Sequence, residues 1–234
     1  MLSTEIRVRA DEQRGANSES LYQGYNVGAC FQKNLGRQRL EHYIADIFYA
    51  NYGARNIEYQ DLLCSLEQNS SLVAALGLSS ASRRNLFCEQ YLNAPLENYV
   101  EREFGQKVNR NSLMELGNLV ASEPGQSVVL YLLVTAALQM AGVRYLVFSA
   151  NRAVRSSIQR CGFDTHVLCS ADPGNLEGEQ QNWGTYYDGD PKVILADIRQ
   201  AADHGHKHKM IAELWLREEL LVDNLSDAIA CLCR

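Results

Sequence analysis

The chain has 234 residues, 46% of them hydrophobic and 21% charged, which is the composition of an ordinary globular protein. Its formal net charge of -6 argues against a nucleic-acid binder, because such proteins neutralise phosphates with clustered lysine and arginine. The most apolar segment, 128–143, is too short to span a bilayer, and residues 1–15 lack the apolar run of a signal peptide, so we expect a cytoplasmic protein. The seven cysteines are scattered along the sequence, and we expect them to be reduced thiols.

The first half of the chain is predicted to combine strands with short helices. Apolar residues recur at helical spacing from Leu40, and glycine at position 53 is a typical residue after a helix end. The expected elements are a strand over Glu5–Arg9, a helix from Leu40 to about Gly53, strands over Leu72–Ser79 and Leu86–Leu92 that form a hairpin, and a helix from Pro95 to about Phe104.

In the second half strands alternate with helices, which predicts right-handed crossovers and parallel pairing. The expected elements are strands over Ser112–Ala121, Arg144–Ala150, Thr165–Cys169 and Lys192–Ile198, helices over Ser127–Ala141 and Arg152–Cys161, a loop over Ala171–Asp190, and a mostly helical segment over His206–Ile229. Without repeats or linkers, we expect one domain over 1–234, with a core at about 37–198 and a C-terminal helical extension at about 204–234.

The loop from Ala121 to Ser127 connects a predicted strand to a helix, yet it matches neither the dinucleotide fingerprint nor the P-loop. Backbone N–H groups from Gly125 to Val129 could hold a pyrophosphate or a phosphopantetheine phosphate. A plain helix start capped by Ser122 or Ser127 is the alternative.

Glu115 is the first candidate catalytic residue. Alternation along its strand puts it on one face with Leu113, Gly117 and Leu119, so its carboxylate is either ion-paired or has a raised pKa that suits a general base. Gly117 leaves room for a ligand or another backbone, or else marks a bulge. Asn118 faces the opposite side and either contacts substrate or satisfies the backbone.

Glu89 is the second candidate. On the strand predicted for 86–92, Glu89 and Tyr91 share one face, and if this face meets the one that carries Glu115, two carboxylates and a phenol converge on an amine acceptor. An exposed edge strand is the alternative.

Aromatic residues gather in the predicted loop before the last strand. Trp183, Tyr186 and Tyr187 could cover a substrate, or close the end of the sheet. Arg152 and Arg155 could dock an acidic partner protein or form a solvated helix face. The run from His204 to His208 has lysine interleaved and no cysteine or carboxylate cluster, so we expect no metal site.

The segment Asn151–Phe163 resembles the closing signature of the GNAT acyltransferase fold through Asn151 and the pair Gly162-Phe163. It departs from that fold at Ile158, where many members have a tyrosine general acid, and at the loop, which keeps only Gly125 and Gln126 of the pyrophosphate-binding pattern. The resemblance implies a donor site made of Gly117, Leu119, Val120, Ala121, Gly125, Gln126, Ser127, Asn151, Arg152 and Arg155.

Three motifs, 87–95, 115–121 and 183–187, resemble the thermostable hemolysin family over about 37–198. This family is related to GNAT proteins and acyl-homoserine-lactone synthases. The resemblance implies an α/β fold with a GNAT-like mixed, centrally splayed sheet flanked by helices, and an extra C-terminal helix.

It also implies an N-acyltransferase that moves a fatty acyl group from coenzyme A or an acyl carrier protein to a small amine or amino acid. A backbone N–H near Val120 would polarise the thioester carbonyl, and Glu115 with Glu89 would orient or deprotonate the amine. The alternatives are a membrane-lytic protein and a non-catalytic partner subunit, and a homodimer through the C-terminal helix is a further possibility.

Overall fold

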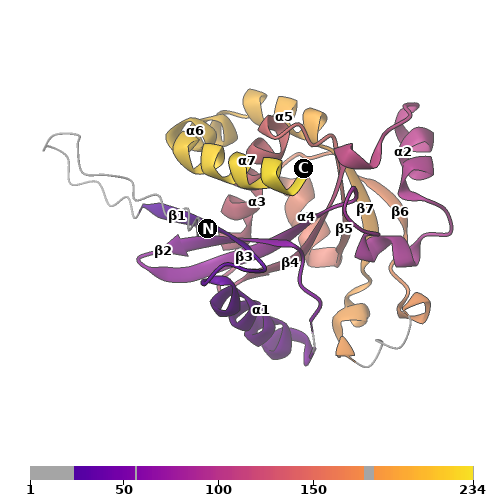
Figure 1. Ribbon diagram of the computed structural model, residues 1–234, viewed down its shortest axis with the longest axis horizontal. Helices are drawn as coiled ribbons and strands as arrows, with labels where there is room; N and C mark the ends of the chain where they lie inside the picture. The colour runs from indigo at the N-terminus through magenta and orange to yellow at the C-terminus, as the bar shows by residue number, and fades with distance from the viewer. Residues whose placement is uncertain (1–23, 56, 177–181, 234) are drawn as a thin grey trace, which may run out of the picture.

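A mixed sheet in the order β1-β2-β3-β4-β5-β7-β6 runs through the computed structural model, which describes residues 24–55, 57–176 and 182–233 (Figure 1). Neighbouring strands pair antiparallel, except that β4 and β5 are parallel. The strands are β1 (Tyr25–Phe31), β2 (Leu62–Gln68), β3 (Ser71–Ser80), β4 (Leu113–Ala121), β5 (Tyr145–Ala150), β6 (His166–Ser170) and β7 (Lys192–Asp197).

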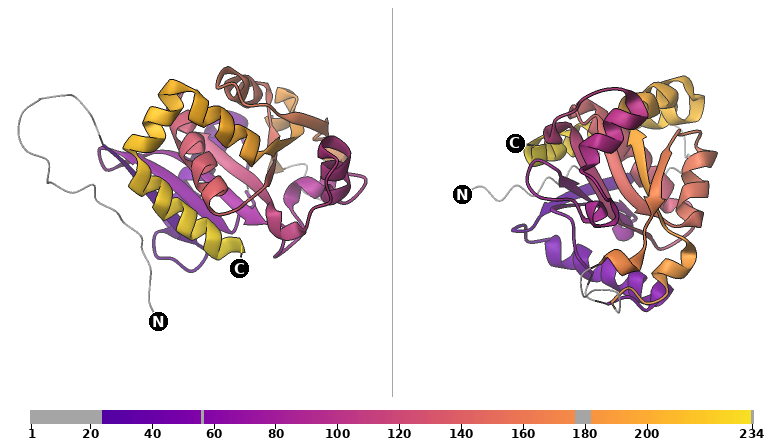
Figure 2. Two further views of the ribbon diagram at one scale, coloured as in Figure 1. Left: turned by 90° about the horizontal axis from the view of Figure 1, so that it is seen from above. Right: turned by 90° about the vertical axis from the view of Figure 1, so that its right-hand side faces the viewer.

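Helices cover both faces of this sheet (Figures 1 and 2). One face carries α3 (Gln126–Met140), α4 (Arg152–Arg160), α5 (Ile198–Lys207), α6 (Lys209–Arg217) and α7 (Glu219–Cys233). The other carries α1 (Arg37–Tyr52), α2 (Leu96–Phe104) and the 3₁₀ helix η1 (Phe87–Tyr91). Further 3₁₀ turns are η2 (Arg110–Ser112), η3 (Pro173–Asn175) and η5 (Tyr186–Gly189). The prediction of a mixed sheet flanked by helices is therefore confirmed.

The first helix illustrates how the sequence specifies this arrangement. In α1, Leu40, Ile44 and Phe48 are buried at four-residue spacing, which places them on the single face that packs against the sheet. Gly53 ends the helix with a left-handed φ of 67° and donates its N–H to Tyr49, as the sequence predicted.

The sheet splits between β4 and β5. The two strands pair only over four residues each, Leu113–Leu116 with Tyr145–Phe148, and beyond this stretch they separate. A β-bulge interrupts the pairing of β4 with β3, on the edge of β4 that faces away from β5. At this bulge Asn118 adopts a φ of 53° and the register of the pairing shifts. The predicted central splay is thus present, and it leaves the later part of β4 hydrogen-bonded to β3 alone.

Several sequence predictions about the sheet were wrong. Residues 86–92 hold the 3₁₀ helix η1 and no strand, so the hairpin partner of β3 is β2, whose apolar run Leu62–Leu66 was overlooked together with β1. The expected parallel pairing holds for β4 with β5 alone, because β7 lies between β5 and β6 and runs antiparallel to both. The strand predicted over Glu5–Arg9 lies outside the described residues.

The C-terminal extension consists of three helices that begin at Ile198, earlier than the sequence indicated. The apolar side of α7, with Leu221, Leu225 and Ile229, packs against α3 and the β1–β3 part of the sheet. The homodimer through this extension stays a prediction. Within the described chain, no helix has both the length and the apolar character that crossing a membrane requires.

Candidate functional site

A cavity of about 150 Å³ lies at the split between β4 and β5, and side chains from both core layers line it. We call the part on the α3 side the apolar chamber and the part on the α1 and η1 side the polar chamber. The apolar chamber includes Val134, Leu138, Leu146, Phe148, Phe163 and Ala196, and the polar chamber includes Glu58, Gln60, Cys88, Glu115 and Ser149 with several aromatic rings. The two chambers meet where the strands part, beside Gly117.

The apolar chamber is suited to a hydrocarbon chain. The hydroxyls of Thr135 and Tyr131 are hydrogen-bonded: Thr135 donates to the carbonyl of Tyr131, and the Tyr131 hydroxyl contacts Ser157 and Cys161. Predominantly apolar walls favour an apolar occupant.

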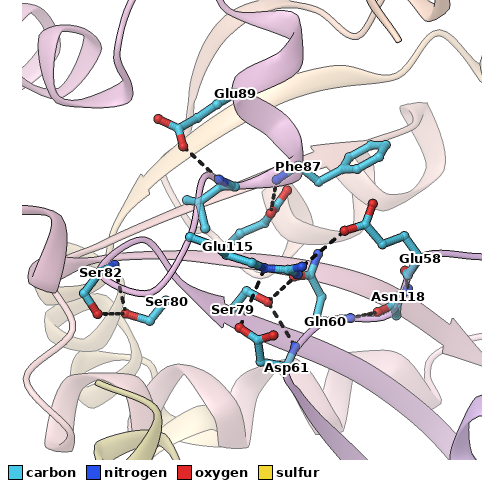
Figure 3. Close-up of polar contacts among 12 residues, drawn as sticks. Glu58, Gln60, Asp61, Ser79, Ser80, Ser82, Phe87, Glu89, Glu115 and Asn118 are labelled. Atoms are coloured by element: carbon cyan, nitrogen blue, oxygen red, sulfur yellow. Dashed lines mark hydrogen bonds and ion pairs between the residues drawn. The ribbon is translucent and has the colours of Figure 1, made fainter. Parts of the chain in front are cut away.

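Glu115 lines the polar chamber and has only 1% of its surface exposed. Figure 3 shows it next to Phe87. Its carboxylate accepts the backbone N–H groups of Phe87 and Cys88 at 2.7 and 2.8 Å. The Cys88 thiol also donates to this carboxylate. The start of η1 thus holds Glu115 in one orientation.

Burial raises the pKa of the Glu115 carboxyl, against the opposing effect of these hydrogen bonds and of the nearby Arg84. Burial, followed by the neighbouring Glu115 carboxylate, also raises the pKa of the Cys88 thiol well above its ordinary value. The thiol therefore stays protonated and acts as a donor to Glu115. The sequence left two alternatives for Glu115, an ion pair or a raised pKa, and the structure supports the raised pKa.

Gln60 is a site residue that the sequence prediction missed. Its side chain lies across Gly77 and Gly117, where a Cβ atom would approach it to 2.6 Å in each case. Its Oε1 atom accepts from Arg84 at 3.1 Å, so Nε2 is directed to the Gly117 side, and among the described residues no acceptor bonds Nε2. Gln60 is 6% exposed and lines the cavity, which makes Nε2 a free, oriented donor.

Asn118 supports the loop that carries Gln60. Its Oδ1 atom accepts the backbone N–H of Gln60 and its Nδ2 atom donates to the carbonyl of Glu58, both at 2.9 Å (Figure 3). These bonds place the Asn118 side chain on the side of Glu58 and Gln60, which line the polar chamber with Glu115, so its predicted position opposite Glu115 was wrong. The bulge at this residue shifts the alternation of β4. Leu119 therefore packs in the α3 layer, so its predicted position on the face of Glu115 was wrong, and Val120 packs under α1.

Glu89 does not meet Glu115 as predicted, because residues 86–92 are not a strand. Its carboxylate bonds Arg110 at 2.7 Å and caps the N–H of Leu86, on the opposite side of the turn from Glu115 (Figure 3). Although burial opposes the change, the bonds from Arg110 and Leu86 lower the pKa of Glu89. Glu89 is not among the described residues that line the cavity, and its catalytic role stays a prediction.

The predicted aromatic residues do gather at the polar chamber. Trp183, Tyr186 and Tyr187 line it together with Tyr91, whose hydroxyl lies 2.7 Å from that of Tyr187. Burial raises the pKa of Tyr186, whose hydroxyl lies 3.2 Å from that of Ser149 beside the split. The Tyr186 phenol therefore stays protonated at neutral pH.

The loop before α3 lies outside the lining of the cavity. Gly125, with a φ of 91°, is the residue before the helix, and no side chain caps the helix start, so the predicted Ser122 or Ser127 cap was wrong. Gln126 instead accepts the backbone N–H of Glu123, and the Ser122 hydroxyl contacts Tyr43. Ala121 ends β4 beside this loop.

At the start of α4, Asn151 both caps the helix through Val154 and bonds the Tyr52 hydroxyl. Arg155 bonds the carbonyls of Ala150 and Asp190, whereas Arg152 is exposed. Asn151 lines the cavity, and the two arginines do not appear in the part of its lining that the structure describes.

Solved structures share this fold at low sequence identity. A structure of the AHL synthase LasI is 7% identical and covers 76% of this chain and 91% of its own, with a TM-score of 0.51. Two structures of BjaI, a CoA-dependent acyl-homoserine lactone synthase, cover 89% of this chain and 100% of their own at 13% and 14% identity, with TM-scores of 0.51 and 0.50. No curated protein matches the sequence.

The model of the family described as thermostable hemolysin matches residues 31–202. The chain belongs to this family, and the resemblance seen in its three motifs is confirmed.

Proposed function

We propose that this member of the thermostable hemolysin family is an N-acyltransferase that moves a fatty acyl group from an acyl thioester to a small amine. The observation that carries the proposal is the cavity at the β4–β5 split, which joins an apolar chamber to a polar chamber with a buried carboxylate, Glu115. An acyl chain and a polar acceptor need these two environments, and their reacting atoms would meet beside Gly117.

The donor would lie with its acyl chain in the apolar chamber and its thioester at the split. One BjaI structure is described with SAM and isopentyl-CoA, which supports a coenzyme A thioester as one candidate donor for this fold. An acyl carrier protein is the other, and the exposed Arg152 is the residue we assign to its docking.

The thioester carbonyl would accept a hydrogen bond from Gln60 Nε2 and from a backbone N–H of β4 between Gly117 and Val120, the stretch that no longer pairs with β5. Donors fixed before the reaction stabilise the oxyanion of the tetrahedral intermediate without reorganisation. Arg84 acts as a positioning residue, because its bond to Gln60 Oε1 directs the amide.

Glu115 would accept one proton from the acceptor ammonium ion, and the free amine would then attack the thioester carbonyl. The new C–N bond forms first, and collapse of the tetrahedral intermediate then breaks the C–S bond. The leaving thiolate takes up one proton, for which we assign the Tyr186 hydroxyl as donor, since Ile158 stands at the position of the usual tyrosine acid. The second proton of the nitrogen restores the Tyr186 hydroxyl, and Glu115 releases its proton to solvent, so the products are an amide, a thiol and one released proton.

Release of free thiol from a panel of acyl-CoA and acyl-carrier thioesters, followed with and without amines, tests the proposal. We expect amine-dependent thiol release and an amide product of the corresponding mass. If no donor gives thiol release above background and none raises the melting temperature, the chain is not an acyltransferase of this kind.

A further inference from the structure

The charged groups at the polar chamber are unbalanced. Glu58 and Glu115 are the only charged side chains among the described residues that line the cavity, and both are acidic. A carboxylate-bearing ligand would therefore meet two carboxylates and no lining cation.

The nearest cation, Arg84, already bonds acidic and polar groups of the protein. Its guanidinium bonds Glu58 at 3.2 Å, Gln60 at 3.1 Å and Ser79 at 2.9 Å, and its Nε lies 3.7 Å from Asp61. These contacts share its charge with two carboxylates, and although its buried Nε makes no hydrogen bond, Arg84 is not among the described residues that line the cavity.

Aromatic rings make up much of the remaining wall of the polar chamber. The Tyr186 ring lies 5.4 Å from Tyr52 and 5.7 Å from Trp183, and Trp183 lies 5.7 Å from Phe87. These four rings form a continuous wall, which we call the aromatic wall. Aromatic π-systems attract organic cations and give no comparable stabilisation to a carboxylate.

We propose that the acceptor is a primary amine without a free carboxylate, bound as its ammonium ion between Glu115 and the aromatic wall. This inference rests on the proposed acyl transfer and narrows its acceptor. Gln60 Nε2 lies beside Gly117 at the split, where the thioester carbonyl needs it, and the buried Nε1 of Trp183 is a second donor without a bonded acceptor among the described residues. An amino acid would bring a carboxylate into a chamber whose described lining holds no cation, and one neutral N–H donor does not compensate for the loss of its hydration.

Matched pairs of ligands that differ only by the carboxylate test this inference without any acyl donor. Suitable pairs are tyramine with L-tyrosine, 3-methylbutylamine with L-leucine, and 2-phenylethylamine with L-phenylalanine. Calorimetric titration of the full chain, alone and with free coenzyme A, is expected to show each amine binding at least about tenfold more tightly than its amino acid. 2-Phenylethanol, which lacks the ammonium group, should bind more weakly than 2-phenylethylamine.

Variants locate the binding. Glu115→Gln should weaken amine binding about tenfold, whereas Glu115→Asp keeps the charge and should retain the preference for the amine. The control is Glu97→Gln, which removes a carboxylate that pairs with Arg110 outside the cavity lining and should leave amine affinity unchanged. The inference is overturned if an amino acid binds as tightly as its amine, or if no amine in the panel binds under either condition.

The failure of this inference is distinguishable from failure of the proposed function. If the protein acylates amino acids faster than the matched amines, acyl transfer stands and the acceptor class is wrong. If amines bind but no thioester releases thiol, the binding site stands and the reaction is wrong.

Discussion

Replacing Glu115 by glutamine separates the catalytic from the structural role of the buried carboxylate. Glutamine has the same shape, keeps one oxygen as an acceptor, and replaces the other by an NH₂ group that cannot accept the N–H of Phe87 or Cys88. It also removes a fully buried carboxylate, which is the only one among the described residues of the cavity lining and which the proposed reaction needs as a base.

Two effects on stability oppose each other. One backbone N–H loses its acceptor, which costs about 1–3 kcal/mol, whereas removing the charge relieves a desolvation penalty of roughly several kcal/mol per buried ion. Because burial raises the pKa of Glu115, the second effect outweighs the first. We therefore expect Glu115→Gln to be at least as stable as the parent at neutral pH.

The sign of the pH dependence follows from the raised pKa. The folded parent keeps its proton on Glu115 at pH values where the unfolded chain has lost it, so the stabilisation from this group is complete below the ordinary carboxyl pKa and is lost as the pH rises through the raised value. Glutamine does not titrate. The stability of the variant relative to the parent should therefore rise with pH over this window and level off above it.

Turnover should change far more than stability. Loss of a positioned general base lowers the rate by roughly 10²–10⁴-fold. The acidic limb of the parent's pH profile of kcat/KM should lie above the ordinary carboxyl pKa and should be absent from the residual activity of the variant.

The assay combines thiol release with urea unfolding at several pH values, and circular dichroism confirms that the variant is folded. A variant that turns over within about twofold of the parent would refute the assignment of Glu115 as base, since general bases contribute far more than that. A variant that is less stable than the parent at neutral pH would refute the energetic argument for its burial.

Other substitutions test the surroundings of the site. Gly117→Ala brings a Cβ atom to 2.6 Å from Gln60 Nε2 and to 3.2 and 3.3 Å from its Cγ and Cδ, so the Gln60 side chain must shift. The shift should displace Nε2 and lower kcat about 10²-fold, as measured by steady-state kinetics on protein with a parent-like melting curve. Glu89→Gln weakens the partly exposed bond to Arg110 and should lower the free energy of unfolding in urea by roughly 1–2 kcal/mol. Turnover per folded molecule should stay unchanged, and a loss of turnover would support the predicted catalytic role instead. Asp197→Ala removes the cap of α5 and should cost about 1–3 kcal/mol in the same unfolding measurement, and an unchanged midpoint would contradict that role.

Local patterns were enough to predict most helices and the strands of the second half. These patterns depend only on residues close together in the sequence. Examples are the spacing of Leu40, Ile44 and Phe48, the glycine at position 53, and the alternation of strands and helices between 113 and 160. The motifs at 115–121 and 183–187 likewise indicated the family. Nine of the predicted site residues line the cavity: Tyr91, Glu115, Gly117, Asn118, Leu119, Asn151, Trp183, Tyr186 and Tyr187.

Tertiary contacts decided the rest. Residues 87–91 have a strand-like composition, yet they form a 3₁₀ turn because Glu115, 27 positions further along the chain, accepts the N–H of Cys88. Strand order is also non-local, so the insertion of β7 between β5 and β6 could not be read from alternation alone. Gln60 has no sequence signal of its own: its amide becomes a free donor only where Gly77 and Gly117 leave room and Arg84 fixes its orientation. The sequence by itself therefore determined which residues form helices and which family they resemble, whereas the folded chain decided which polar groups are buried together, because burial and pairing depend on neighbours far apart in sequence.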